Sequence, residues 1–327
     1  MNYEIRDCID AGTEFCPCHL AETGDCILCS QLSGKKFCDC INWKGVCIYQ
    51  EYIWNNSKAK PLRKIFNCKI VNKEAVERNV VIFNISVPHE LIKNLVHPGS
   101  YVFLRSTKAS QFYDVPISIM DTNTDENIIT VAIEIKGIKT KSLNELKDGD
   151  NILIRGPYFN GELGLRNIFK SKEGSAVVII RGIGQAPVVP VLKKLYSNGN
   201  KIIVIMDKAH YKNIFINKYL EMCNCTVINC NTLQAGAVSE ELKNILNNLL
   251  EKEKINLIHC SAPDILNFKV LDFLDGKVDF SCCNNAKMCC GEGICGACST
   301  RFKGQRVKKL CKVQIEPKYI FDGRRFI

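Results

Sequence analysis

The chain lacks any hydrophobic run long enough to cross a membrane. Its longest apolar runs, such as Ala176–Ile180 and Ile202–Met206, are five residues long, whereas a membrane-spanning helix needs about 20 apolar residues. The first ten residues, MNYEIRDCID, contain no apolar signal segment. We therefore expect a cytoplasmic protein without a membrane span, in a reducing compartment where disulfides are rare.

Internal repeats and nucleic-acid-binding motifs are also missing. The sequence shows no self-similarity at the periods typical of solenoids. It shows no fold motif of a nucleic-acid-binding protein either, although its formal net charge is +10. With 327 residues, 46% hydrophobic and 24% charged, the chain can form two or more compact domains. We expect a multidomain globular protein with no nucleic-acid partner.

Cysteine is the residue that the chain has in excess. Of its 20 cysteines, eight lie within residues 1–47 and seven within residues 282–311. In a reducing compartment, dense cysteine spacing indicates metal binding rather than disulfides. Two metal-binding regions are therefore expected, one near each end of the sequence.

The C-terminal cysteines have a specific spacing. Cys290-x4-Cys295-x2-Cys298 is followed by Cys311 after twelve more residues, which is typical of a plant-type 2Fe–2S cluster. A zinc ribbon would normally show two separated C-x2-C pairs. The loop glycines should take positive φ angles and bring backbone N–H groups towards the sulfurs; they are Gly291, Gly293 and Gly296. We predict that these four cysteines bind a 2Fe–2S cluster and that the chain carries electrons, with zinc or a redox disulfide as the alternative.

Between the cysteine-rich ends, hydrophobic patterning predicts two domains. Short alternating segments separated by turns predict a small antiparallel barrel; they are RKIFNCKIV, VVIFNISV, SYVFLRS, IITVAIEI and NILIRG. Strands that alternate with helices then predict a doubly wound parallel sheet; the strands are AVVIIRG, KIIVIMD, CTVINC and NLIHCSA, and the helices cover 186–199, 211–222 and 239–254. We predict a cysteine-rich module (1–60), a barrel (61–163), an α/β domain (164–276) and a cluster segment (277–327).

Four motifs in these domains are similar to those of the ferredoxin–NAD(P) reductase superfamily. They are Val115-Pro116-Ile117-Ser118-Ile119, the turn Ile135–Leu143, Gly156–Gly161, and the loop Ile180-Arg181-Gly182-Ile183-Gly184-Gln185-Ala186-Pro187. Over residues 61–327 the chain resembles the electron-transfer subunit of dihydroorotate dehydrogenase. It resembles more closely the small subunit of NADH-dependent ferredoxin:NADP oxidoreductase.

The resemblance implies FAD in the barrel and NAD(H), or alternatively NADP(H), in the α/β domain. Pro116, Ile117, Ser118 and Ile119 would lie along the flavin, and Gly137, Lys139 and Thr140 would hold its diphosphate at a helix N-terminus. Gly182, Gly184, Ala186 and Pro187 would bind the nicotinamide nucleotide, Asp207 its ribose hydroxyls, and Cys260 would face the nicotinamide. Three positions depart from the family pattern: Val115 replaces an arginine, and Lys139 and Arg181 replace glycines.

The first sixty residues lie outside the resemblance. Their cysteines follow the spacing Cys16-x-Cys18, Cys26-x2-Cys29, Cys38-x-Cys40 and Cys47, with Cys8 before them. A module this small needs a metal or disulfides to fold, and a reducing compartment selects metal. We predict a second metal site that holds 4Fe–4S or zinc, and eight cysteines are enough for two sites. A flexible arm of reduced thiols is the alternative, and Trp43 and Trp54 are expected to pack the module.

These features predict an electron-transfer subunit of an NAD(P)H-dependent oxidoreductase. Electrons would move between NAD(P)H, FAD and the 2Fe–2S cluster, and on to or from a catalytic partner subunit or a ferredoxin. Within the enzyme class, the alternative is the electron-transfer subunit of dihydroorotate dehydrogenase in pyrimidine synthesis. A second alternative is a non-catalytic iron–sulfur adaptor with decayed flavin and nucleotide sites.

Overall fold

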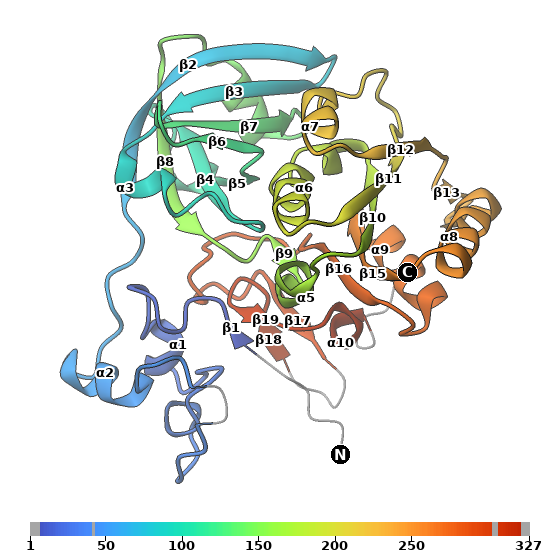
Figure 1. The fold of residues 1–327 in the computed structure, drawn as a ribbon. Helices are drawn as coiled ribbons and strands as arrows, with labels where there is room; N and C mark the ends of the chain where they lie inside the picture. Colours follow the sequence, from blue (N-terminus) through green and yellow to red (C-terminus); the bar gives the residue numbers. More distant parts are fainter. Residues whose placement is uncertain (1–6, 41–42, 303–306, 322–327) are drawn as a thin grey trace.

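A computed structural model describes residues 7–40, 43–302 and 307–321. The chain forms a barrel and an α/β domain side by side, and the C-terminal segment lies below them against the N-terminal module (Figure 1). In the part of the chain that the structure describes, no helix has the length and apolar character needed to cross a bilayer.

The barrel is a seven-stranded antiparallel sheet in the order β5-β4-β8-β2-β3-β7-β6. Alternate residues of the strands point their side chains into the barrel and fill it; Phe83, Val102 and Ile152 are examples, and all three are fully buried. The antiparallel order and this alternation of side chains confirm the predicted antiparallel barrel. Its elements are β2 (Ile65–Glu77), β3 (Val80–Ser86), α3 (His89–Ile92), β4 (Tyr101–Ser106), β5 (Val115–Ser118), β6 (Asp121–Asn123), β7 (Ile128–Glu134), α4 (Ile138–Asn144) and β8 (Asn151–Tyr158).

The α/β domain is a six-stranded sheet in the order β12-β11-β10-β15-β16-β9, parallel except for the edge strand β9. Alternate residues of β10 pack on opposite faces: Val178 lies with helices α5–α7, and Ile179 with helices α8 and α9. This confirms the predicted doubly wound sheet. The elements are β9 (Glu162–Leu163), α5 (Leu165–Lys170), β10 (Ser175–Arg181), α6 (Val188–Ser197), β11 (Lys201–Asp207), α7 (Asn217–Met222), β12 (Thr226–Asn229), β13 (Leu233–Gln234), β14 (Ala237–Val238), α8 (Glu240–Lys252), β15 (Ile255–Ser261), α9 (Asp264–Leu274) and β16 (Asp279–Cys283).

Two sequence expectations need correction at this level. The helix expected over 211–222 begins only at Asn217, because the preceding residues pack down on the barrel side, where the N–H of Asn213 donates to Glu77 Oε1 at 2.6 Å. Trp43 and Trp54 do not pack the module, since they are 59% and 69% exposed.

The N-terminal module is paired with the C-terminal segment. Strand β1 (Asp7–Cys8) forms an antiparallel pair with β19 (Val313–Gln314), with Cys8 opposite Val313. The remaining elements are α1 (His19–Glu22) and α2 (Ile48–Trp54) in the module, and β17 (Ser299–Arg301), β18 (Val307–Lys309) and α10 (Pro317–Phe321) in the C-terminal segment. The N-terminal module and the C-terminal segment therefore meet below the two domains (Figure 1).

Four charged side chains are buried where these parts meet. Arg63, just before the barrel, donates to Asp10 Oδ1 at 2.6 Å and to Glu292 Oε2 at 2.7 Å. Lys312 donates to Asp10 and lies 3.3 Å from Glu292 Oε2. All four residues are at most 5% exposed. Two cations thus neutralise two carboxylates from four separate segments of the chain, which is the arrangement that makes buried charge tolerable.

Lys312→Met tests this network. Removal of one buried cation leaves the two carboxylates with only Arg63, so we expect the free energy of unfolding to fall by about 3–5 kcal/mol. Urea unfolding followed by circular dichroism measures the change. Lys243→Met is the control, because Lys243 pairs with Glu240 on the surface of α8 and should change stability by less than about 0.5 kcal/mol. Equal losses in the two variants would contradict the role of the network.

Candidate redox site

A cavity of about 700 Å³ lies between the barrel and the α/β domain. The barrel contributes Pro116, Ile117 and Ser118 from β5. The α/β domain contributes the loop after β10 and the residues that follow β15 and β16, so its share comes from the carboxyl ends of parallel strands, where open α/β sheets bind ligands. These lining residues are Arg181–Gly184, Ala186, Pro187, Ala262–Asp264 and Cys283–Asn285. The cavity brings together the predicted flavin strand and the predicted nucleotide loop.

The glycine loop leaves β10 as a short 3-10 turn, Gly182–Gln185, before α6 begins. Gly182 has a φ of +57°, which favours glycine. A Cβ at Gly184 would lie 1.9 Å from the carbonyl oxygen of Ser261. Gly184 is therefore required by the close approach of two backbones inside the protein, in addition to any role towards a ligand.

The carboxylate of Asp207 is held by several hydrogen bonds. Its Oδ2 accepts hydrogen bonds from the N–H and hydroxyl of Thr232, at 2.7 and 2.6 Å, and from Arg181, while its Oδ1 accepts from the N–H of Ala209. Burial opposes its ionisation, but these partners outweigh burial and lower the pKa of Asp207. Asp207 holds Arg181, which lines the cavity, and both residues line a neighbouring cavity of about 740 Å³. The predicted role of Asp207 towards the ribose hydroxyls remains a prediction.

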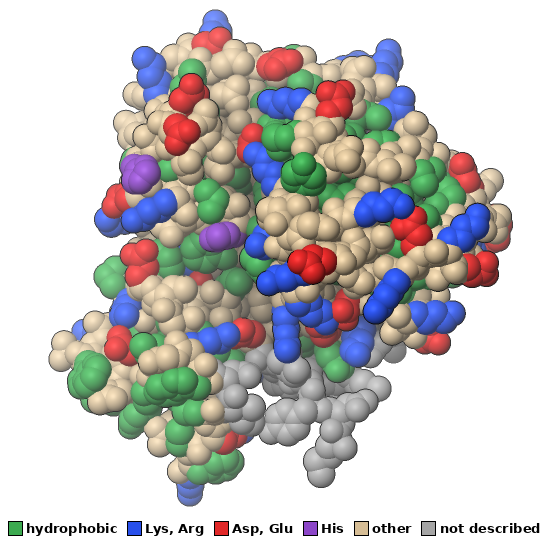
Figure 2. Space-filling view, viewed as in Figure 1, with side chains coloured by type: hydrophobic (Ala, Val, Ile, Leu, Met, Phe, Trp, Pro, Cys, Tyr) green, Lys and Arg blue, Asp and Glu red, His purple; other side chains and the backbone are tan. Residues whose placement is uncertain are grey.

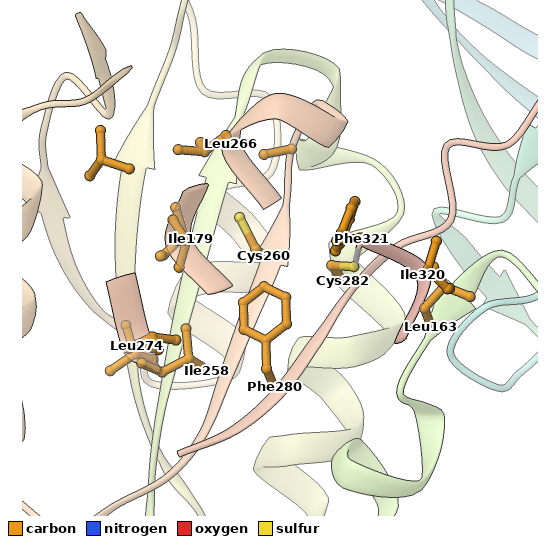
Figure 3. Packing of buried hydrophobic residues seen from close by; sticks show 14 of the residues in the cluster. Leu163, Ile179, Ile258, Cys260, Leu266, Leu274, Phe280, Cys282, Ile320 and Phe321 are labelled. Atoms are coloured by element: carbon orange, nitrogen blue, oxygen red, sulfur yellow. The ribbon is translucent and has the colours of Figure 1, made fainter. Parts of the chain in front are cut away.

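Cys260 and Ile119 also do not reach the cavity. Cys260 is fully buried on the opposite face of the sheet, among Ile179, Leu266 and Phe280 (Figure 3). Ile119 is 1% exposed and packs inside the barrel. Contrary to expectation, both side chains therefore lie away from the cavity: Cys260 packs in the layer covered by α8 and α9, and Ile119, one residue after β5, packs in the barrel core. The cysteine that lines the cavity is Cys283, which no sequence motif indicated.

The turn before α4 lies beside β5 and reaches the cavity through Lys136, whereas Gly137, Lys139 and Thr140 are not among the lining residues. Thr140 Oγ1 accepts hydrogen bonds from the N–H groups of Lys136 and Gly137, at 3.0 and 3.2 Å, so Thr140 caps its own helix. Lys139 donates to the carbonyl oxygen of Asp114 at 2.9 Å. The predicted roles of Gly137, Lys139 and Thr140 towards the FAD diphosphate remain predictions.

The C-terminal cysteine loop has the backbone that its glycines predicted. Gly291, Gly293 and Gly296 have φ angles of +73°, +77° and +74°. Backbone N–H groups point at three of the four sulfurs: Cys290 Sγ accepts from Glu292 and Cys295, Cys295 Sγ from Ala297, and Cys298 Sγ from Cys311, at 3.3 to 3.5 Å. Hydrogen bonds of this kind favour thiolate over thiol.

Cys298 and Cys311 are close enough to share a proton. A hydrogen bond from Cys311 lowers the pKa of Cys298 and raises the pKa of Cys311. The pairing favours the thiolate form of Cys298, which is the form that binds metal. The donor set of the loop thus fits an iron–sulfur cluster.

Side chains of the barrel hold the cysteine loop next to the cavity. Arg155 donates to Asp114 Oδ2 at 3.0 Å, and Asp114 directly precedes β5. The same guanidinium donates to the carbonyl oxygen of Cys290 at 2.9 Å. A Cβ at Gly291 would lie 2.4 Å from the ring of Tyr158, so the loop packs directly on the barrel.

Cys283 belongs to a buried polar group behind the cavity. Its sulfur lies 3.4 Å from Glu162 Oε1 and 3.1 Å from the hydroxyl of Ser261. The second oxygen of Glu162 and Nε2 of His259 lie 4.0 Å apart and have no other partner. Burial raises the pKa of Glu162 from 4.5 to about 8 and lowers the pKa of His259 from 6.5 to about 3. At neutral pH both groups are therefore neutral.

The N-terminal cysteines separate into two groups. Cys16, Cys18 and Cys26 line one small cavity together with Cys8, which was not in the predicted ligand set. The outer group surrounds Cys40, whose sulfur lies 3.3 Å from that of Cys38 and interacts electrostatically with Cys29 and Cys47. The predicted ligands thus lie near one another without forming a single set.

Comparison with known proteins agrees with this architecture. The family model for the oxidoreductase FAD-binding domain matches residues 67–162. The electron-transfer subunit of dihydroorotate dehydrogenase B (NAD(+)) from Clostridium acetobutylicum is 30% identical over 66% of this chain and 82% of the relative. The corresponding subunit from Streptococcus mutans is 27% identical over 68% of this chain and 84% of the relative.

Solved structures share the fold at lower identity. The structure of an NADH-dependent reduced ferredoxin-NADP oxidoreductase matches 77% of this chain and 86% of its own, with a TM-score of 0.59 at 22% identity. Phthalate dioxygenase reductase matches 77% and 95%, with a TM-score of 0.52 at 14% identity. The chain is thus an oxidoreductase subunit with an FAD-binding domain of the ferredoxin-NADP reductase type. More particularly, it belongs to the family of electron-transfer subunits of dihydroorotate dehydrogenase B.

Glu162→Gln tests the buried polar group, because glutamine mimics the protonated carboxyl. The unfolded chain ionises Glu162 near pH 4.5 while the folded chain keeps it protonated up to about pH 8. The wild type should therefore lose stability as the pH rises between these values, and the variant should not. Melting temperatures measured across this range check the result, with the exposed Glu221→Gln as control. The loss of stability that protonation of His259 causes as the pH falls below 6.5 should remain in the variant. If the difference in melting temperature between wild type and variant did not change with pH, the raised pKa of Glu162 would be contradicted.

Proposed function

We propose that this protein is the electron-transfer subunit of an NAD(P)H-dependent flavin and iron–sulfur oxidoreductase. The observation that carries the proposal is the juxtaposition of the 700 Å³ cavity and the cysteine loop, which Asp114 and Arg155 link through direct hydrogen bonds. FAD accepts two electrons as a hydride and releases them singly, and a 2Fe–2S cluster accepts one.

The cavity lining suits a flavin and a nicotinamide nucleotide. Its size is in the range of cofactor pockets, and its walls combine apolar residues with a few polar groups. Pro116, Ile117 and Ser118 would lie along the flavin on the barrel side. Gly182, Ala186 and Pro187 would approach the nucleotide from the other side. This arrangement positions two planar ligands from opposite walls.

The cysteine loop would hold the 2Fe–2S cluster through Cys290, Cys295, Cys298 and Cys311. Cys290 and Cys295 belong to the surface-accessible part of the loop, whereas Cys298 and Cys311 are buried. Arg155 and Tyr158 orient the loop from β8. The described residues thus supply ligands, backbone hydrogen bonds and a rigid support, which is what a cluster site requires.

A partner protein is part of the proposal. Hydrophobic side chains gather on the outer face of the N-terminal module, at the lower left of Figure 2. The exposed apolar residues of this module are Phe37, Trp43, Val46, Tyr49, Ile53 and Trp54. Exposed apolar groups concentrated in one region are typical of interaction sites. We propose that the catalytic partner subunit, or a ferredoxin, docks here.

The pyrimidine-pathway enzyme is the second candidate, favoured by the family to which the chain belongs. These relatives match 66% and 68% of this chain, and the resemblance of the sequence motifs does not extend to the module over residues 1–60. We propose the domain limits 1–60, 61–163, 164–276 and 277–327, and a cytoplasmic location. Mass spectrometry of the co-purifying subunit separates the two candidates.

The central experiment combines spectroscopy with one cysteine variant. The purified protein should contain FAD and show flavin bands above broad cluster absorption, and NADH should bleach both under anoxic conditions. Cys311→Ser should remove the 2Fe–2S signal in electron paramagnetic resonance and keep flavin reduction. Cys289→Ser is the matched control, since Cys289 is an exposed neighbour of Cys290. Protein without flavin, or unchanged by NADH, would support the adaptor alternative instead.

Arg181→Ala tests the nucleotide site. Arg181 lines the cavity and is oriented by Asp207, so its loss should remove a charged contact to the dinucleotide. We expect KM for NADH or NADPH to rise about 10- to 100-fold, with a smaller change in kcat. Lys201→Ala is the control, because Lys201 lies at the opposite end of the same sheet and pairs with Glu253. An unchanged KM would exclude Arg181 from the nucleotide site.

A further inference from the structure

Four cysteines of the N-terminal module converge on one place. Cys8, Cys16, Cys18 and Cys26 line a single small cavity, together with apolar groups such as Leu20. The thiol of Cys8 interacts electrostatically with that of Cys18, and the thiol of Cys16 with those of Cys18 and Cys26. The four sulfurs therefore form one donor set, although they are spread over nineteen positions of the sequence.

Burial raises the pKa of all four thiols, and nearby backbone N–H groups partly offset this rise. These N–H groups belong to Asp10 for Cys8, to Gly12 for Cys16 and to Leu20 for Cys18. The N–H of Cys29 donates to Cys26 Sγ at 3.4 Å. The same pattern of N–H groups directed at sulfur occurs in the C-terminal cysteine loop. Such hydrogen bonds stabilise the thiolate ligands of a metal and tune iron–sulfur clusters.

The spacing of the sulfurs favours a cluster over a single zinc ion. Four sulfurs around zinc lie about 3.8 Å from one another, because each is about 2.3 Å from a tetrahedral metal. Among the described residues, three ligand atoms come within 4.8 Å of one another only in the group Glu162, His259 and Cys283. The N-terminal set is therefore more widely spaced than a zinc site, as is the C-terminal set. Its cavity of about 20 Å³ has room for a water-sized sphere, which a zinc tetrahedron does not leave.

The N-terminal set lies directly against the C-terminal cysteine loop. Leu20 lines the small cavity, and a Cβ at Gly293 would be 3.1 Å from its Cγ. On another side, the N–H of Ile9 donates to the carbonyl oxygen of Lys312 at 2.9 Å. Cys8 precedes Ile9 and Cys311 precedes Lys312, so each cysteine is one residue away from this hydrogen bond. The side chain of Leu20 and the strand pair β1–β19 lie between the two cysteine sets.

We propose that Cys8, Cys16, Cys18 and Cys26 bind an iron–sulfur cluster of the 4Fe–4S type, which exchanges single electrons with the C-terminal cluster. In each exchange one cluster loses one electron and the other gains it, and no bond or proton changes place. The exchange rests on the proposed 2Fe–2S site, whereas the cluster itself does not. Electrons would then enter or leave the protein through the N-terminal module.

The outer cysteines are outside this site. Cys38 and Cys40 are exposed and their sulfurs lie 3.3 Å apart, so their geometry differs from that of the inner set. They provide no ligand to the small cavity.

The test uses the full chain, purified and handled without oxygen. Wild-type protein should contain about six or more irons per flavin, because 2Fe–2S and 4Fe–4S sum to six. The double variant Cys16→Ser/Cys18→Ser should lose about four irons per chain and one of two signals in electron paramagnetic resonance after reduction. Its flavin and its 2Fe–2S signal should remain. Cys225→Ser, in the α/β domain, is the control and should lose nothing.

Three results would overturn the proposal. A wild-type ratio of about two irons per flavin excludes a second cluster, whether or not the variant folds. Loss of one zinc with no loss of iron assigns the site to zinc. Unchanged metal content in the double variant excludes these cysteines as ligands. Wild-type protein that lacks flavin, but whose double variant still loses about four irons, would contradict the proposed function and leave this site standing.

Discussion

The buried network of Asp10, Arg63, Glu292 and Lys312 is the interaction on which the arrangement of the chain depends. Burial alone would raise the pKa of Asp10 and Glu292, but the two cations outweigh it and lower both values. Replacement of any one member by a neutral residue leaves a buried charge unpaired and should lower the free energy of unfolding by several kcal/mol. The four residues come from the N-terminal module, the segment just before β2, the cysteine loop and the chain that follows it, so these parts hold a fixed geometry. Fixed geometry is what transfer between neighbouring redox groups requires.

A second network connects the cavity with the cysteine loop. Asp114 binds Arg105 and Arg155, and Arg155 reaches the carbonyl oxygen of Cys290. Asp114 also precedes Val115, where the family pattern has an arginine. The ammonium group of Lys139 donates to the carbonyl oxygen of Asp114. The departures at positions 115 and 139 are therefore neighbours in space.

The sequence predicted the layers of the fold and the backbone of the cysteine loop, because both follow from local rules. Alternation determined the barrel, and positive φ angles followed from glycine at positions 291, 293 and 296. The sequence alone could not predict which face of a strand borders the cavity when both faces of that strand are buried. Cys260 and Cys283 both lie in buried strands, yet Cys260 packs with α8 and α9 whereas Cys283 lines the cavity. The sequence also could not predict the hydrogen bonds of Asp207, because its partners Arg181 and Thr232 are distant from it in sequence.

The exposure of the two tryptophans has a practical consequence. The chain contains no others, and both lie in the first sixty residues. Their side chains are 59% and 69% exposed, at positions where neither the barrel nor the α/β domain covers them. The intrinsic indole fluorescence of the whole protein therefore originates in the N-terminal module. It is a built-in optical label for the part of the chain that family resemblance does not cover, and no dye has to be attached to observe that part alone.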